Sequence, residues 1–132
     1  MTAISIAEYR RLKTRGTKYR NTLIVVAGEK YRSRKEYVFH TQCQVQTKAA
    51  DPAQRIVKIE REVYYRLVPA QRDAKGRLVE RAMGYFLDFR LTFADGRVEH
   101  VDVKSPATRK IASYIQKRKL LLLVHGIRIH EL

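Results

Sequence analysis

The stretch GYFLDFRLTFADGRVEHVDVKSPATRK, residues 84–110, decides the fold, because it predicts two strands, a tight turn and a helix start in direct succession. Every second side chain from residue 85 to residue 93 is Tyr, Leu or Phe. This alternation is typical of a strand that buries one face. The tripeptide ADG at 94–96 turns the chain, and a second strand is expected to return antiparallel over residues 97–104.

The length of this turn sets which residues of the two strands face each other. With a three-residue turn in which Gly96 adopts the left-handed conformation, Asp88 falls directly opposite Asp102. A two-residue turn would pair Phe89 with Asp102 and mix the buried face of one strand with the polar face of the other. We therefore expect the first register, with Lys104 on the same polar face as the two carboxylates.

Two carboxylates placed side by side on a sheet repel each other unless a cation or a proton neutralises them. Carboxylate oxygens are hard ligands that suit Mg²⁺ or Mn²⁺. A simpler interpretation is that Asp88, Asp102 and Lys104 form a solvated sheet face in which Lys104 is a salt-bridge partner. The spacing of the three residues alone leaves both interpretations open.

The remaining patterns predict a mixed central sheet flanked by helices, an α/β or α+β fold. Ser5 and Glu8 have capping-box spacing, Ser33 precedes a second helical pattern, and Ser105-Pro106 starts a third. Helices are expected over residues 6–13, 34–48 and from 106 to about 124, where Gly126 stops the last one. A hairpin is expected from 22–26 and 30–32, and longer strands over 56–68, 78–93 and 97–104. A loop over 69–76 separates two of these strands, and a short strand is expected within 127–132.

Length and composition indicate one soluble domain over residues 1–132, with a short helix and a basic segment at 1–21. The single cysteine, Cys43, can form no internal disulfide and belongs to no structural zinc pattern, which suggests a reducing compartment. The N-terminal stretch lacks a continuous apolar region, and the longest apolar runs are too short to span a bilayer. A cytoplasmic protein, in the host cytoplasm if it is phage-encoded, is expected.

The charge of the chain points to an anionic partner. Its 28 Lys and Arg against 13 Asp and Glu give a formal net charge of +15, spread along the whole sequence. Such a balance attracts polyanions, with nucleic acid as the first candidate and an anionic membrane surface as the second. Charge indicates this class of partner and no activity.

Six short motifs follow one another in a recognisable order. They are TKYRN (17–21), GEKYRSRKEY (28–37), IEREVYYRLVP (59–69), YFLDF (85–89), HVDVKS (100–105) and QKRKL (116–120). This order resembles the PD-(D/E)xK nuclease superfamily, and most closely its small phage-type, Holliday-junction-resolvase-like nucleases, over residues 17–132. The chain departs from that pattern at Glu62-Val63, where such nucleases often have Gln-Pro, and at Asp102, where many have Glu.

The resemblance implies a restriction-endonuclease-like core and a metal-dependent DNA endonuclease that acts in recombination, repair or branched-DNA processing. It implies that Asp88, Asp102 and the backbone carbonyl of Val103 hold Mg²⁺ or Mn²⁺. The metal would polarise the scissile phosphate and activate water, while Lys104 would orient that water or balance the charge of the transition state. No membrane partner is expected, and a branched substrate with two cuts would require a homodimer.

Other residues carry two interpretations each. Glu36 fits a capping box with Ser33, and it also stands where the superfamily places a helical glutamate near the metal. Lys117, Arg118 and Lys119 are expected to contact phosphates beside the cut, or to form a solvated helix face. Arg90 and His100 share the polar face of the hairpin and are candidates for DNA contact or for structural roles. Of Tyr64 and Tyr65, one is expected in the core and the other exposed, where it could stack on a base.

Two other functions remain open on the sequence. In the first, the chain is a basic DNA- or RNA-binding protein without catalysis, and its acidic pair is only a sheet face. In the second, it is the end-cutting subunit of a transposon, with the same active site and additional protein partners. Divalent-ion binding separates the first of these from a nuclease.

Overall fold

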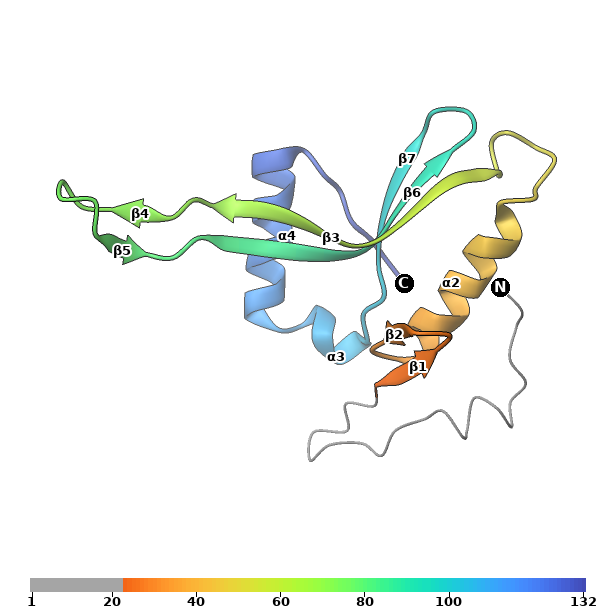
Figure 1. Ribbon diagram of the computed structural model, residues 1–132, viewed down its shortest axis with the longest axis horizontal. Helices are drawn as coiled ribbons and strands as arrows, with labels where there is room; N and C mark the ends of the chain where they lie inside the picture. Colours follow the sequence, from red (N-terminus) through yellow and green to blue (C-terminus); the bar gives the residue numbers. More distant parts are fainter. Residues whose placement is uncertain (1–22) are drawn as a thin grey trace. The chain divides into compact units, whose positions relative to one another are not determined.

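The structure, a computed structural model, describes residues 23–132, and its backbone contacts divide the chain into two compact units, Met1–Ile56 and Val57–Leu132 (Figure 1). The expected helix over 6–13 and the basic segment at 1–21 lie outside the described residues. The described part contains three helices and a four-stranded mixed sheet, so the coarse prediction of a mixed α+β fold is confirmed. The prediction of a single domain over residues 1–132 stays a prediction.

The first unit contains a hairpin followed by a helix, as its sequence predicts. β1 (Ile24–Val26) and β2 (Glu29–Tyr31) pair antiparallel, and α2 (Arg34–Gln46) ends two residues before the expected boundary. The helix begins where predicted because the Ser33 side chain accepts a hydrogen bond of 3.1 Å from the Glu36 amide. The core of this unit is made of Ile24, Val26, Tyr31 and Tyr37.

The second unit is built on the sheet that carries the Asp pair. Its strands are β3 (Ile56–Val68), which begins at the boundary between the units, β6 (Met83–Phe93), β7 (Val98–Asp102) and β8 (His130–Glu131), in the spatial order β3-β6-β7-β8. β6 and β7 are antiparallel, whereas β7 and β8 are parallel, which makes the sheet mixed. β7 is therefore an inner strand with a hydrogen-bonded neighbour on each side.

The register of β6 and β7 is the one that the turn predicts. Phe89 pairs with Val101 and Arg90 with His100, so the pairing continued by one position places Asp88 opposite Asp102. The three-residue turn is closed by a 2.9 Å hydrogen bond from the Phe93 amide to the Arg97 carbonyl. Gly96 supplies the left-handed conformation, with φ of 91°. The expected core face is confirmed, since all of Tyr85, Leu87, Phe89, Leu91 and Phe93 are buried.

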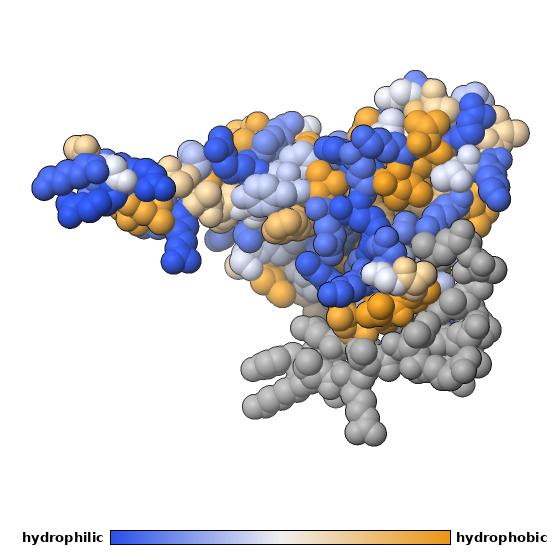
Figure 2. All heavy atoms as spheres, viewed as in Figure 1, coloured by the Kyte–Doolittle hydropathy of each residue, from blue (hydrophilic) through white to orange (hydrophobic). Residues whose placement is uncertain are grey.

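Two predictions for this part of the chain are wrong in part: the loop over residues 69–76 and the single strand over 78–93. β4 (Gln71–Arg72) and β5 (Leu78–Glu80) form a hairpin that continues β3 and β6 beyond the sheet (Figure 1). Asp73 stabilises its turn, because its side chain accepts from the amides of Lys75 and Arg77 at 2.9 and 3.0 Å. Most of this hairpin is hydrophilic, with a smaller apolar patch (Figure 2).

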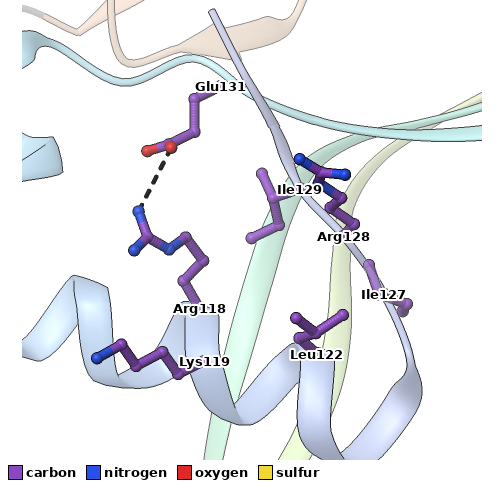
Figure 3. Close-up of a pocket in the computed structure, with 7 residues that line it drawn as sticks. All are labelled: Arg118, Lys119, Leu122, Ile127, Arg128, Ile129 and Glu131. Carbon is purple, nitrogen blue, oxygen red and sulfur yellow. Dashed lines mark hydrogen bonds and ion pairs between the residues drawn. The ribbon is translucent and has the colours of Figure 1, made fainter.

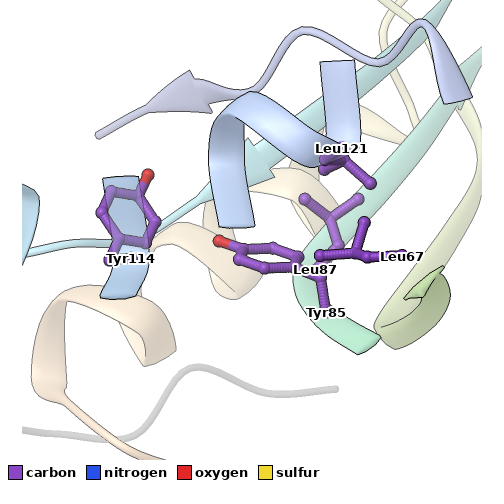
Figure 4. Close-up of a cluster of buried hydrophobic side chains, with 5 residues drawn as sticks. All are labelled: Leu67, Tyr85, Leu87, Tyr114 and Leu121. Atoms are coloured by element: carbon purple, nitrogen blue, oxygen red, sulfur yellow. The ribbon is translucent and has the colours of Figure 1, made fainter. Parts of the chain in front are cut away.

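The single helix expected after Lys104 is also wrong, because two helices occupy its place. Ser105 caps α3 (Pro106–Arg109) by accepting from the Thr108 amide at 3.2 Å, and α4 (Ala112–His125) follows after Ile111, which is extended. α4 ends before Gly126, as predicted. Its side chains pack on the sheet in one core cluster, made of Leu67, Tyr85, Leu87, Tyr114 and Leu121 (Figure 4).

None of the helices within residues 23–132 combines the length and the apolar character that a membrane crossing requires.

Candidate active site

Asp88, in the middle of β6, and Asp102, the last residue of β7, lie side by side on neighbouring strands, and each side chain accepts a hydrogen bond from the backbone of the other strand. The amide of Asp88 donates to Asp102 Oδ1 at 3.0 Å, and the amide of Val103 donates to Asp88 Oδ2 at 2.9 Å. Asp88 is only 6% exposed and Asp102 is fully buried. Burying a carboxylate is costly unless the charge is neutralised, so this position of the sheet is adapted to a cationic neighbour.

Lys104 is the nearest such neighbour that the sequence predicts. Its Nζ lies 3.8 Å from Asp88 Oδ2, and its side chain is 16% exposed. The same ammonium group lies 5.7 Å from the centre of the Tyr114 ring, which is within range of a cation–π interaction. The structure therefore brings Asp88, Asp102 and Lys104 together, and the interpretation of these residues as a solvated face does not agree with their burial.

Tyr114, Glu131 and Arg118 form a second layer beside this group. The Tyr114 hydroxyl donates to Glu131 Oε2 at 2.8 Å, and Arg118 Nη1 lies 3.4 Å from Glu131 Oε1. Burial raises the pKa of Tyr114 well above its usual range, and the hydrogen bond to Glu131 and the charge of Asp102 act in the same direction. Tyr114 thus stays a neutral phenol beside the ammonium group of Lys104.

The backbone around Lys104 is held by the end of β8. Asp102 pairs with Glu131, the Leu132 amide donates to the Asp102 carbonyl at 2.9 Å, and the Lys104 amide donates to the Leu132 carbonyl at 3.3 Å. No local pattern predicted this contact, because the two short segments that pair in parallel are far apart along the chain. It holds the segment from Asp102 to Lys104 in a defined conformation.

The donor atoms at this site fit a hard divalent cation. Asp88 and Asp102 provide carboxylate oxygens, and the expected contribution of the Val103 carbonyl adds another oxygen. Within residues 23–132 no three His, Cys, Asp or Glu side chains gather to hold a metal ion. Mg²⁺ is commonly held by one or two carboxylates together with water and substrate phosphates, so a two-carboxylate site suits Mg²⁺ or Mn²⁺ better than Zn²⁺.

Arg90 has a partner inside the protein, which the sequence did not reveal. It forms an ion pair with Glu60 and donates to the Tyr65 hydroxyl at 2.9 Å. The bond to Arg90, followed by that to Lys58, lowers the pKa of Glu60 to about 2. Burial and the charge of Arg90 lower the pKa of His100, which opposes Arg90 on β7. The contact of Arg90 with DNA stays a prediction, whereas its structural ion pair is observed.

The basic residues of α4 do not all face the same way. Arg118 and Lys119 line a pocket of about 340 Å³ between α4 and the segment that leads to β8, whereas Lys117 does not line it. Arg128 brings a third cation to this pocket, and Glu131 pairs with Arg118 at its edge (Figure 3). Arg128 was not predicted from the sequence, since it lies in a strand pattern outside the QKRKL motif.

Comparison with known families places the chain in one of them. The family model described as "Protein of unknown function (DUF1064)" matches residues 16–126. The chain belongs to the DUF1064 family. No curated protein and no solved structure matches it. The matched segment of this DUF1064 chain contains Asp88, Asp102 and Lys104, and the family description assigns them no activity.

Two glutamates of the DUF1064 chain need separate mention. Glu36 is buried on α2 and its amide is bound by Ser33, but it belongs to the first unit, and its part in a metal site stays a prediction. Glu62 is exposed in β3 and has φ of 52°, a left-handed conformation that is rare for residues other than glycine. Glu62 stands at the position where the nucleases that the sequence resembles often have Gln, in a Gln-Pro pair.

Proposed function

We propose that this chain is a metal-dependent DNA endonuclease with a restriction-endonuclease-like core, in which Asp88 and Asp102 hold Mg²⁺ or Mn²⁺. The observation that supports it most is the arrangement of three residues: two adjacent buried carboxylates with the Lys104 ammonium group 3.8 Å from one of them. A strand pair that only needed to pack would be more stable with apolar residues in these places. Membership of the PD-(D/E)xK superfamily is part of this proposal.

Each residue of the site has a distinct part in phosphodiester hydrolysis. The Asp88 and Asp102 carboxylates would hold the cation, which would supply polarisation of the phosphodiester and activation of water for attack. Lys104 places a positive charge beside the reacting phosphate and stabilises the additional negative charge of the transition state. The Tyr114 ring and the Asp88 carboxylate keep the Lys104 ammonium group in position.

The cations of the α4 pocket support the DNA part of the proposal. Arg118, Lys119 and Arg128 line the same pocket, and each can neutralise a phosphate oxygen of the DNA backbone. Together with the net charge of +15, they provide affinity that does not depend on sequence. Cleavage of branched DNA by a homodimer, in recombination or repair, is the form of this activity that we propose.

The test is a cleavage assay with purified protein and labelled junction, flap, single-stranded and duplex DNA, and with RNA, in Mg²⁺, Mn²⁺ or EDTA. Cleavage is expected with Mg²⁺ or Mn²⁺ and is lost in EDTA. The Asp102→Asn variant should retain DNA binding without cleavage, and Glu99→Gln is the matched control, because Glu99 lies on the same strand and forms an exposed ion pair with Arg97. Cleavage by Asp102→Asn at the wild-type rate would overturn the proposal.

A second candidate function is nucleic-acid binding without catalysis, and one observation favours it. Lys104 lies within ion-pair distance of Asp88, so part of the acidic charge is already neutralised within the protein. In that case Mn²⁺ gives no binding heat in calorimetry, and every nucleic acid in the panel stays intact. Binding of Mn²⁺ by the wild type and its loss in Asp88→Asn would exclude this candidate.

A further inference from the structure

We propose that Tyr64 and Phe86 form a stacking surface for an unpaired base of the DNA substrate. We call these two rings the aromatic pair. The inference rests on the nucleic-acid part of the proposed function, and it adds a preference for substrates with single-stranded bases next to the cut.

The aromatic pair is exposed although its strands are paired within the sheet. Tyr64 on β3 and Phe86 on β6 are 49% and 56% exposed, and their ring centres lie 5.1 Å apart at an angle of 52°. Large aromatic side chains are normally among the most buried residues of a protein. Two neighbouring half-exposed rings leave aromatic surface accessible to solvent, which is the chemical character of a surface that binds bases.

Gly84 is required for this arrangement. A Cβ atom at residue 84 would overlap the ring carbons and the hydroxyl oxygen of Tyr64, so the Tyr64 ring lies directly against the glycine backbone. A glycine inside a strand costs stability, because it packs no side chain. The Tyr64 ring compensates for part of this loss, but this structural role leaves the exposure of Phe86 unexplained.

The position of the aromatic pair relates it to the candidate active site. Phe86 and Asp88 are two residues apart on β6, so their side chains leave the same side of the strand about 7 Å from each other. A base stacked on Phe86 therefore has its phosphate close to Asp88. Arg66 is exposed two residues beyond Tyr64 on β3, and its carbonyl accepts a 2.7 Å hydrogen bond from the His125 ring. The Arg66 guanidinium group provides charge for a neighbouring phosphate.

The base that binds must be unpaired. A base within a duplex is covered on both faces by its neighbours, and an exposed protein ring cannot reach either face. A base in a single strand, a flap or the centre of a junction has a free face. The aromatic pair thus favours DNA in which the nucleotide beside the cut is not part of a continuous duplex.

The test measures binding in EDTA, where no cleavage occurs. A labelled single-stranded oligonucleotide and a blunt duplex of the same sequence are titrated with wild-type protein, Tyr64→Leu and Phe86→Leu, and fluorescence anisotropy gives the two affinities. Each leucine variant should weaken single-strand binding by about tenfold or more, with little change for the duplex. Leu123→Ala is the control for a loss of exposed apolar surface, since Leu123 is 80% exposed on α4.

Gly84→Ala is a second variant that retains both rings. The new methyl group displaces the exposed Tyr64 ring, and single-strand affinity should fall as it does in Tyr64→Leu. If the leucine variants and Gly84→Ala all bind both DNA forms as the wild type does, the stacking inference is wrong. A changed oligomeric state with unchanged single-strand affinity would also overturn it, because it would show that the rings contact a second copy of the chain.

Failure of this inference can be distinguished from failure of the proposed function. If the wild type cleaves DNA with Mn²⁺ and the leucine variants bind single strands normally, only the stacking inference is lost. If the wild type binds no nucleic acid in either form, both are lost. If binding follows the aromatic pair but no DNA is cut, the stacking inference stands and catalysis is excluded.

Discussion

Replacing Asp102 with asparagine should stabilise the metal-free protein. Residues directly opposite on antiparallel strands have Cβ atoms about 5 Å apart, and two unit charges at that distance repel by about 3 kcal/mol at an effective dielectric constant near 20. The asparagine side chain would keep an oxygen for the Asp88 amide, now 3.0 Å from Asp102 Oδ1, but exchange of a charged acceptor for a neutral one costs about 1 kcal/mol. The expected gain is about 2 kcal/mol, or roughly 8 °C in Tm.

The same change at Asp88 should not stabilise the protein. Asp88→Asn removes the same repulsion, but it also removes the ion pair of Lys104, whose Nζ is 3.8 Å from Asp88 Oδ2 and largely buried. The two effects oppose each other, so this variant should be no more stable than the wild type. The difference between the two substitutions follows from the position of Lys104 on the Asp88 side of the pair.

Thermal unfolding of the wild type and both variants, in EDTA and in Mn²⁺, measures these effects. A ligand at about one hundred times its Kd stabilises the folded state by about 2.7 kcal/mol, so Mn²⁺ should raise the Tm of the wild type and leave that of Asp102→Asn unchanged. The order of stability of these two proteins should therefore invert when Mn²⁺ is added. The reasoning is refuted if Asp102→Asn is less stable than the wild type in EDTA and its Tm rises as much as that of the wild type in Mn²⁺. As the control, Glu99→Gln should have the Tm of the wild type in both conditions.

Four further substitutions test other residues. In a single-turnover rate assay at saturating DNA, Lys104→Ala should lower the cleavage rate by about two orders of magnitude. In a binding assay at several salt concentrations, Lys119→Ala should weaken DNA affinity and reduce the slope of its salt dependence by about one unit. The pKa of Glu60 in the folded state is lowered to about 2, so ionised Glu60 stabilises the fold above its unfolded-state pKa, and this stabilisation is lost as the pH falls toward 2. In Glu60→Gln, the free energy of unfolding should therefore fall less steeply with decreasing pH than in the wild type, as measured by denaturation at a series of acidic pH values. Tyr31→Phe removes the 2.7 Å hydrogen bond to a buried imidazole in the first unit and should cost about 1–3 kcal/mol by chemical denaturation, while DNA cleavage by a folded protein is unchanged.

The central hairpin could be predicted from local rules. The alternation from Tyr85 to Phe93 determines the buried face, and the conformation of Gly96 determines the turn, so the register that joins Asp88 to Asp102 follows from about twenty consecutive residues. The caps at Ser33 and Ser105 are equally local, and both are observed.

What the sequence did not predict depends on contacts between distant residues. The pairing of Arg90 with Glu60 joins positions 30 residues apart, and nothing near Arg90 distinguishes an internal ion pair from a phosphate contact. The hairpin of β4 and β5 was missed because Asp73 and Gly76 are typical of any loop, and strands of two or three residues have too few positions to show an alternation. The break at Ile111 lacks a glycine or a proline, so no local signal marks it.

The two residues of β8 have a consequence for handling the protein. His130 and Glu131 cover one side of β7, and without them the backbone groups of Val101 and Asp102 would form an open sheet edge. An open edge can recruit a strand from another molecule, which leads to aggregation. A version of the chain shortened before His130 would therefore combine a distorted segment around Lys104 with a tendency to precipitate, and its loss of activity would reflect misfolding rather than the removal of a catalytic group.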